Sequence, residues 1–134
     1  MKQISIFIEN EKGKLAAVTS LLAENEINLK ALSVADTAEY GILRIVTDNV
    51  EKAMAVLAEN AYLAKVTDVL AVKTEDKPGS LAKIITALSQ AGISVEYAYA
   101  FTASEPGVAL LVFRVDNNEK AVSALIKAGV GVAL

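Results

Sequence analysis

Two stretches of this chain repeat each other at a fixed spacing, and no other feature limits the possible folds as strongly. Gly13 in NEKGKLAAVTSLL and Gly79 in EDKPGSLAKIITAL lie 66 residues apart. The same spacing relates Asn10 to Asp76, Leu15 to Leu81, Val18 to Ile84, Leu22 to Leu88 and Ile27 to Ile93. From Asp48 and Asp116 onward the spacing is 68, which indicates a two-residue insertion near residues 104–106. Such a repeat predicts two copies of one supersecondary unit, at residues 1–67 and 68–134.

Each copy has the same predicted order of strands and helices. Apolar residues alternate over 4–8, as in a half-buried strand, whereas Leu15, Val18 and Leu22 recur with helical spacing. The first copy continues with strands at 27–37 and 40–48, joined at the polar Ala38-Glu39, a helix at 49–60 and a strand at 62–67. The second has a strand at 69–73, a helix from Leu81, strands at 93–103 and 107–116, a helix at 117–128 and a strand at 129–134. This order predicts an α+β chain of two ferredoxin-like β-α-β-β-α-β units, each with an antiparallel sheet covered by helices on one face.

The composition excludes several classes of function. The chain has no Cys and no His, which removes thiolate and imidazole catalysis and most zinc sites. Its net charge of −3 is shared almost evenly by the two copies, so neither has the basic surface that nucleic-acid binding requires. No apolar run reaches the roughly 18 to 20 residues that span a membrane, and the start lacks a signal-peptide pattern. We therefore expect a soluble cytoplasmic protein that binds no metal, cofactor, nucleic acid or membrane.

The turn before each predicted helix resembles a known family. In the second copy DKPGSL at 76–81 opens a helix, and AGISV at 91–95 begins the next strand. This is similar to the ACT domain, in which an Asp-x-Pro-Gly-x-Leu turn is followed by a strand that begins with Gly-Ile-Asn. The first copy has NEKGKL at 10–15, with Asn for Asp and no Pro, and NEIN at 25–28. The whole chain therefore resembles a stand-alone tandem ACT protein.

The resemblance implies a non-catalytic regulatory protein. ACT domains set their sheets side by side and bind small molecules, often amino acids, between two domains. A chain with no catalytic domain of its own would act as a sensor, or would regulate a separate metabolic enzyme in trans.

Apolar residues on both faces of several strands, such as adjacent Leu110, Leu111 and Val112, predict a homodimer.

A ligand site is expected where each helix begins. The start of a helix leaves backbone N–H groups unpaired and favours a carboxylate, and glycine lets a ligand approach the backbone. The residues predicted at these turns are Asn10, Lys12, Gly13, Lys14 and Leu15 in the first copy, and Asp76, Pro78, Gly79, Ser80 and Leu81 in the second. A purely structural explanation is open for each: glycine for its backbone angles, Asn10 and Asp76 for shaping the turn, and Pro78 for starting the helix.

The resemblance adds a second half to each predicted site, at the start of the second strand of the other copy. These residues are Asn28 and Leu29 in the first copy and Ser94, Val95 and Glu96 in the second. Glu96 is suited to hold the ammonium of an amino acid, whereas Lys30 at the matching position would repel it. The alternative is that both are solvated charges at a strand edge.

Two other functions are compared with the regulatory one. Tyr97, Tyr99 and Phe101 share one strand face, as in RNA-binding modules of this topology, but without basic neighbours they indicate packing or a dimer surface. A small enzyme such as an acylphosphatase would need Arg in its phosphate loop, whereas Arg44 and Arg114 both lie inside predicted strands. A protein-interaction subunit without a metabolite remains the main alternative.

Overall fold

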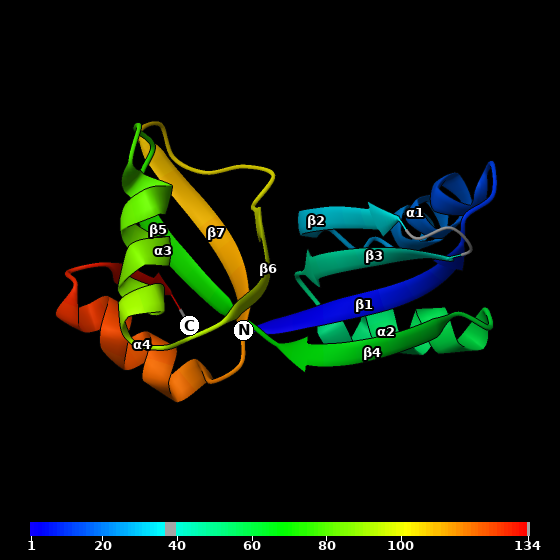
Figure 1. Ribbon diagram of the computed structural model, residues 1–134. Coiled ribbons are helices and arrows are strands. Elements are labelled where there is room, and N and C mark those ends of the chain that lie inside the picture. The colour runs from blue at the N-terminus through cyan, green and yellow to red at the C-terminus, as the bar shows by residue number, and fades with distance from the viewer. Residues whose placement is uncertain (37–39, 134) are drawn as a thin grey trace. The chain divides into compact units, whose positions relative to one another are not determined.

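Each half of the chain folds around its own apolar core. The computed structural model describes residues 1–36 and 40–133, so the turn expected at Ala38-Glu39 lies outside the described residues. The chain divides into a first module, Lys2–Thr67, and a second module, Asp68–Leu134 together with Met1 (Figure 1). Both have the predicted β-α-β-β-α-β order, which confirms the α+β ferredoxin-like fold.

The first module has four strands and two helices in its described residues. These are β1 (Lys2–Glu9), α1 (Lys14–Glu24), β2 (Leu29–Asp36), β3 (Tyr40–Thr47), α2 (Val50–Glu59) and β4 (Leu63–Asp68). The sheet order is β2-β3-β1-β4, and β3 pairs antiparallel with both β1 and β2. Ile4, Ile6 and Ile8 of β1 point to one face, where they meet the buried side of both helices, including Val18 and Leu57. The helices therefore cover one face of the sheet.

The second module repeats this arrangement. Its elements are β5 (Leu70–Glu75), α3 (Ser80–Gln90), β6 (Val95–Ala100), β7 (Val108–Val115), α4 (Asn118–Lys127) and β8 (Gly131–Ala133), with sheet order β6-β7-β5-β8. Its core contains Leu70 and Val72 of β5, Ile84 and Leu88 of α3, and Phe113 of β7. Because β8 lies beside β5, the turn from α4 to β8 reaches the end of the sheet where α3 begins.

The same irregularity occurs in both sheets. The register between β2 and β3 shifts between Leu29 and Ala31, and that between β6 and β7 shifts between Val95 and Tyr97. A bulge of this kind places an extra residue in the edge strand and strengthens its twist. Beyond the bulge Tyr97 and Tyr99 share a face as predicted, with ring centroids 6.4 Å apart.

The helices of each module begin in two different ways. The side chains of Asn49 and Asn117 accept hydrogen bonds from the backbone N–H groups of Lys52 and Lys120, which cap α2 and α4. In contrast, α1 and α3 follow Gly13 and Gly79, both in the left-handed conformation, and neither of these described turns gives a side-chain cap. The first-turn N–H groups of α1 and α3 therefore depend on other partners.

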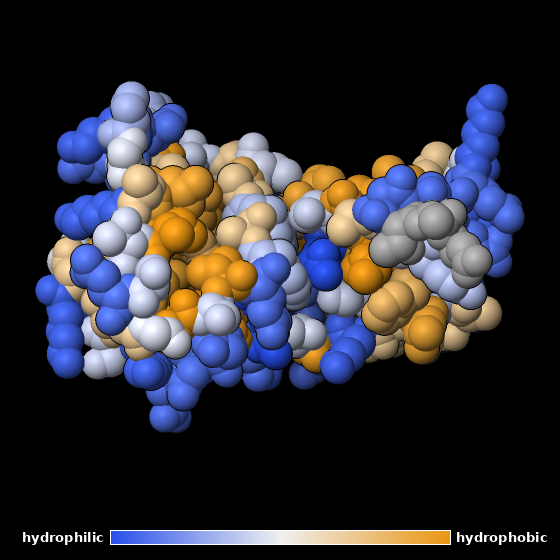
Figure 2. Space-filling model, viewed as in Figure 1, coloured by the Kyte–Doolittle hydropathy of each residue, from blue (hydrophilic) through white to orange (hydrophobic). Residues whose placement is uncertain are grey.

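Two residues expected on the apolar stripe of a helix do not reach the core. Leu15 is 40% exposed and Leu81 52% exposed. Each lies at the start of its helix, beyond the edge of the buried stripe that begins at Val18 and Ile84. Figure 2 shows hydrophobic residues (orange) on the surface of both modules. No helix in residues 1–36 or 40–133 is long and apolar enough to cross a membrane.

Candidate functional site

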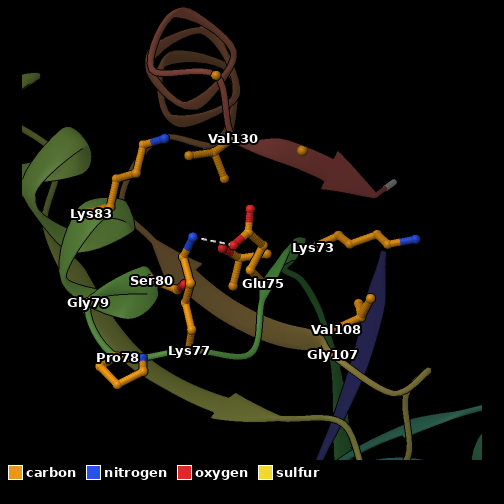
Figure 3. A pocket seen from close by; sticks show the side chains of 13 residues that line it. Lys73, Glu75, Lys77, Pro78, Gly79, Ser80, Lys83, Gly107, Val108 and Val130 are labelled. Carbon is orange, nitrogen blue, oxygen red and sulfur yellow. Dashed lines mark ion pairs between the residues drawn. The ribbon is translucent and has the colours of Figure 1, made fainter.

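A groove of about 570 Å³ opens on the second module at the predicted turn before α3 (Figure 3). It is bordered by the end of β5, the turn into α3, the start of β7 and the turn from α4 to β8. The lining residues are Lys73, Thr74, Glu75, Lys77, Pro78, Gly79, Ser80, Lys83, Gly107, Val108, Gly129, Val130 and Gly131. Of the predicted site residues, the groove brings together Pro78, Gly79 and Ser80.

Glycine keeps this groove open. Gly79 has φ +90° and Gly129 has φ +74°, a region that side chains other than glycine seldom adopt. A Cβ at either position would meet no atom within 4 Å. These backbone angles therefore favour glycine, in line with the structural explanation, and the missing side chains also leave room for a ligand.

Charged side chains give the groove an excess of positive charge. Lys77 forms an ion pair with Glu75 in the middle of the groove (Figure 3). The hydrogen bond and charge of Lys77 hold the pKa of Glu75 below its ordinary value, and the charge of Lys83 acts in the same direction. Lys83 extends from α3 on the side of Val130, whereas the ammonium of Lys73 points away from Glu75 (Figure 3). Three lysines and one glutamate thus line the groove.

The start of α3 adds backbone donors to this charge. Ser80 and Lys83 belong to its first turn, and their N–H groups are already bonded to the carbonyls of Lys77 and Gly79. The two N–H groups between them receive no side-chain cap in this described turn. A helix start with unpaired N–H groups, next to lysine side chains, is suited to bind an anionic group such as a carboxylate.

The other turn residues predicted for the second module lie at the rim or outside the groove. Asp76 and Leu81 are exposed and do not line it. The N–H of Asp76 donates to the carbonyl of Gly107 at 3.0 Å, which fixes the turn against the start of β7. Asp76 therefore positions the chain beside the groove.

The matching turn of the first module is held by contacts between its own side chains. Asn10 donates a hydrogen bond to the carboxylate of Asp36 at 2.6 Å, and Lys14 pairs with Glu9 at 3.8 Å. Gly13 has φ +88°, as the turn requires. Lys12 and Leu15 are exposed. A ligand at this turn would have to compete with the Lys14–Glu9 ion pair.

The predicted second half of each site lies far from the turn of its own module. Residue Leu29 pairs with Thr47 at one end of the first sheet, whereas Glu9 pairs with Tyr40 at the other. A strand of eight residues spans about 26 Å, so one module cannot bring both halves to one ligand. The pairing of each turn with a strand start of the other copy stays a prediction.

Local bonds already occupy much of the predicted strand starts. Asp48 accepts a hydrogen bond from the N–H of Asn28, and Asp116 does the same for Ser94. The carbonyls of Asn28 and Ser94 in turn accept the N–H groups of those aspartates. The backbone N–H and carbonyl groups of Asn28 and Ser94 therefore already have hydrogen-bond partners within their own modules.

The remaining strand-start residues also have partners inside their own module. Leu29 and Val95 pack against the two cores. Glu96, expected to hold an ammonium, forms an ion pair with Arg114 at 3.2 Å. A ligand ammonium at Glu96 would have to displace or share this arginine.

Sequence reasoning did not single out the lysines of the groove. Lys73, Lys77 and Lys83 account for three of the six basic residues in 68–134. Their clustering around the predicted turn could have indicated an anion-binding surface from the sequence alone. The contribution of Gly129 and Gly131 could not be predicted from the sequence, because only the pairing of β8 with β5 brings them to this turn.

Within residues 1–36 and 40–133, no three acidic or other metal-binding side chains gather into a metal site.

Comparisons with known proteins agree with the duplicated fold. A family described as an ACT domain pair matches residues 1–132. A protein of Bacteroides thetaiotaomicron of known crystal structure is 38% identical, with a TM-score of 0.91 over 98% of this chain and 90% of that one. No curated protein matches the chain.

Two regulatory subunits of aspartate kinase are similar in fold. The subunit from Thermus thermophilus, in its ligand-free form, has a TM-score of 0.70 at 21% identity over 95% of this chain and 91% of that one. The subunit from Thermus flavus has a TM-score of 0.64 at 22% identity over 96% and 92%. At these identities the similarity concerns the fold alone.

Proposed function

Because this chain belongs to the ACT domain pair family, we propose that it is a non-catalytic regulatory protein that binds a small molecule, an amino acid, at the start of a helix. The observation that carries this proposal is the groove at Pro78, Gly79 and Ser80. It lies at the turn that the sequence predicted as a site, and it combines open space, an uncapped helix start and lysine side chains.

The chemistry of the groove supports an amino acid as ligand. Its carboxylate would accept hydrogen bonds from the first-turn N–H groups of α3 and from Lys83. Its ammonium would take the place of Lys77 beside Glu75. Because backbone groups supply much of this recognition, removal of the Ser80 hydroxyl should weaken binding only slightly. The cavity volume lies within the range of small-molecule sites, which is roughly 300–1,000 Å³.

We further propose that the protein acts as a homodimer in the cytoplasm and regulates a separate metabolic enzyme. The similar folds that are regulatory subunits of aspartate kinase support this kind of role. Exposed apolar side chains on both modules, such as Leu63 and Ile126, support association with another chain.

Calorimetry with the purified chain and each of the twenty amino acids tests the ligand proposal. We expect at least one to bind more tightly than about 1 mM, which corresponds to roughly 4 kcal/mol. Gly79→Val should abolish that binding because its side chain would extend into the groove, whereas the matched Gly13→Val should retain it. If no amino acid reaches that affinity, the protein-interaction subunit becomes the better description, and size-exclusion chromatography with light scattering then tests self-association.

A further inference from the structure

The charge of the groove differs from that of the matching surface of the first module. Lys73, Lys77 and Lys83 correspond to Phe7, Glu11 and Ala17 at the repeat spacing of 66. None of the three lysines is thus retained in the first module. Glu75 corresponds to Glu9, so the acidic residue is shared and only the basic ones are specific to the second module.

The shape of the two surfaces differs at the same place. Val130 and Gly131, which line the groove, correspond to Tyr62 and Leu63 at the spacing of 68. Tyr62 packs against the core of the first module, and the Leu63 side chain is 70% exposed. Larger apolar side chains, those of a tyrosine and a leucine, therefore occupy the positions where the second module has a valine and a glycine.

From these differences we infer that each chain binds one small ligand in the groove of the second module, and that this ligand carries more negative than positive charge, as aspartate, glutamate or a simple dicarboxylate does. This inference rests on the proposed function and names its ligand class. One carboxylate would bind at Lys83 and the start of α3. The other would bind Lys77 and displace Glu75 from it. A basic amino acid would bring a second ammonium beside Lys77 and Lys83, and the repulsion between these positive charges opposes its binding.

Calorimetry with aspartate, glutamate and succinate, compared with lysine and arginine, tests the ligand class. We expect binding of the acidic ligands with one site per chain, no measurable binding of the basic ones, and weaker binding at high ionic strength. Lys77→Ala and Lys83→Ala should each weaken binding about tenfold, because each removes a charge-assisted hydrogen bond. Both side chains are exposed, so circular dichroism and melting should stay unchanged.

Matched variants in the first module serve as controls. Lys12→Ala and Lys14→Ala remove lysines from the start of its first helix and should leave binding unchanged. Glu75→Gln should strengthen the binding of succinate severalfold, since it frees Lys77 without removing a positive charge. The matched Glu9→Gln should have no effect on affinity.

Other results of these experiments would contradict the ligand class, the assignment to the second module, or the proposed function itself. Binding of a neutral or basic amino acid as tight as that of aspartate or glutamate, or binding insensitive to Lys83→Ala, would overturn the ligand class and leave the regulatory proposal intact. Two sites per chain, or a loss in Lys14→Ala equal to that in Lys77→Ala, would overturn the assignment to the second module. If neither amino acids nor dicarboxylates bind, the proposed function fails with it.

Discussion

The two modules adopt the same backbone turns with different residues. After α1 the chain turns through Glu26 at φ 57°, and after α3 through Gly92 at φ 72°. After α2 it turns through Ala61 at φ 62°, and after α4 through Gly129 at φ 74°. The first module thus holds two non-glycine residues in the left-handed region, at a cost that glycine avoids. The topology requires the angle, whichever residue occupies it.

At the starts of α1 and α3 the side chains differ in charge and size, whereas the backbone conformations are nearly the same. Gly13 and Gly79 share one conformation, with φ +88° and +90°. Around Gly79 the chain places lysines and small residues, whereas around Gly13 it places a balanced set of charges and larger apolar side chains. Duplication therefore preserved the scaffold while the two helix starts diverged in chemistry. Three paired experiments test how far this equivalence extends, and a fourth tests the charges specific to the second module.

The largest effect is expected in the two cores. Leu57 of α2 and Leu125 of α4 are both fully buried at matching positions. Leu57→Ala and Leu125→Ala should each lower the free energy of unfolding by about 2–5 kcal/mol, because each leaves a cavity. Urea denaturation measures both. A loss below about 1 kcal/mol in one variant alone would show that the matching positions are not equivalent in packing.

A smaller effect is expected at the left-handed turns before α1 and α3. Gly13→Val and Gly79→Val should each cost about 1–2 kcal/mol through backbone strain, since the new side chain has open space in both modules. Thermal melting measures the two losses. A marked difference between them would mean that one turn relaxes and the other does not.

The turns that follow α2 and α4 should respond in opposite directions. Ala61→Gly should stabilise the first module by about 0.5–1 kcal/mol, because it relieves a left-handed alanine. Gly129→Ala should destabilise the second by a similar amount. Chemical denaturation of the two variants, compared with the double variant, provides the measurement. Destabilisation by Ala61→Gly would contradict the assigned backbone angle.

The smallest effect concerns the ionisation of Glu75. Lys77 keeps the pKa of this carboxyl below its ordinary value, so Lys77→Ala should raise that pKa, and Lys83→Ala should raise it less. Since the folded pKa is lowered, the stabilisation is present above the ordinary pKa and is lost as pH falls through the lowered one. Side-chain NMR titration measures the shift. An unchanged pKa in Lys77→Ala would argue against the ion pair in solution.

The repeat made the fold predictable from sequence. Ile4, Ile6 and Ile8 signalled a strand, Val18 and Leu22 a helix, and the second copy supported each assignment independently. Element ends differ from expectation by up to three residues, as at β6, for which the sequence predicts a start at residue 93 and which begins at Val95. The ends of elements depend on local hydrogen bonds, such as that of Ser94 to Asp116, which apolar spacing does not record.

The candidate site was predictable only in part. A glycine turn that opens a helix is a local pattern, so Pro78, Gly79 and Ser80 could be found from sequence. The groove also needs Lys83 from one turn further along α3 and Gly131 from the far end of the module, and their approach depends on side-chain direction and sheet order. The partners of Glu96 and Asn10 were missed for the same reason, because Arg114 and Asp36 come from other strands or strand ends.

The bulge at the start of β2 and β6 indicates that the two copies have a common origin. An insertion in an edge strand can arise at many positions, yet both copies carry it at matching residues, before Ala31 and before Tyr97. A single ancestral unit that already contained the bulge accounts for this coincidence. The bulged backbone is therefore a property of the repeated unit itself, whereas the lysines around the groove are a property of the second copy alone.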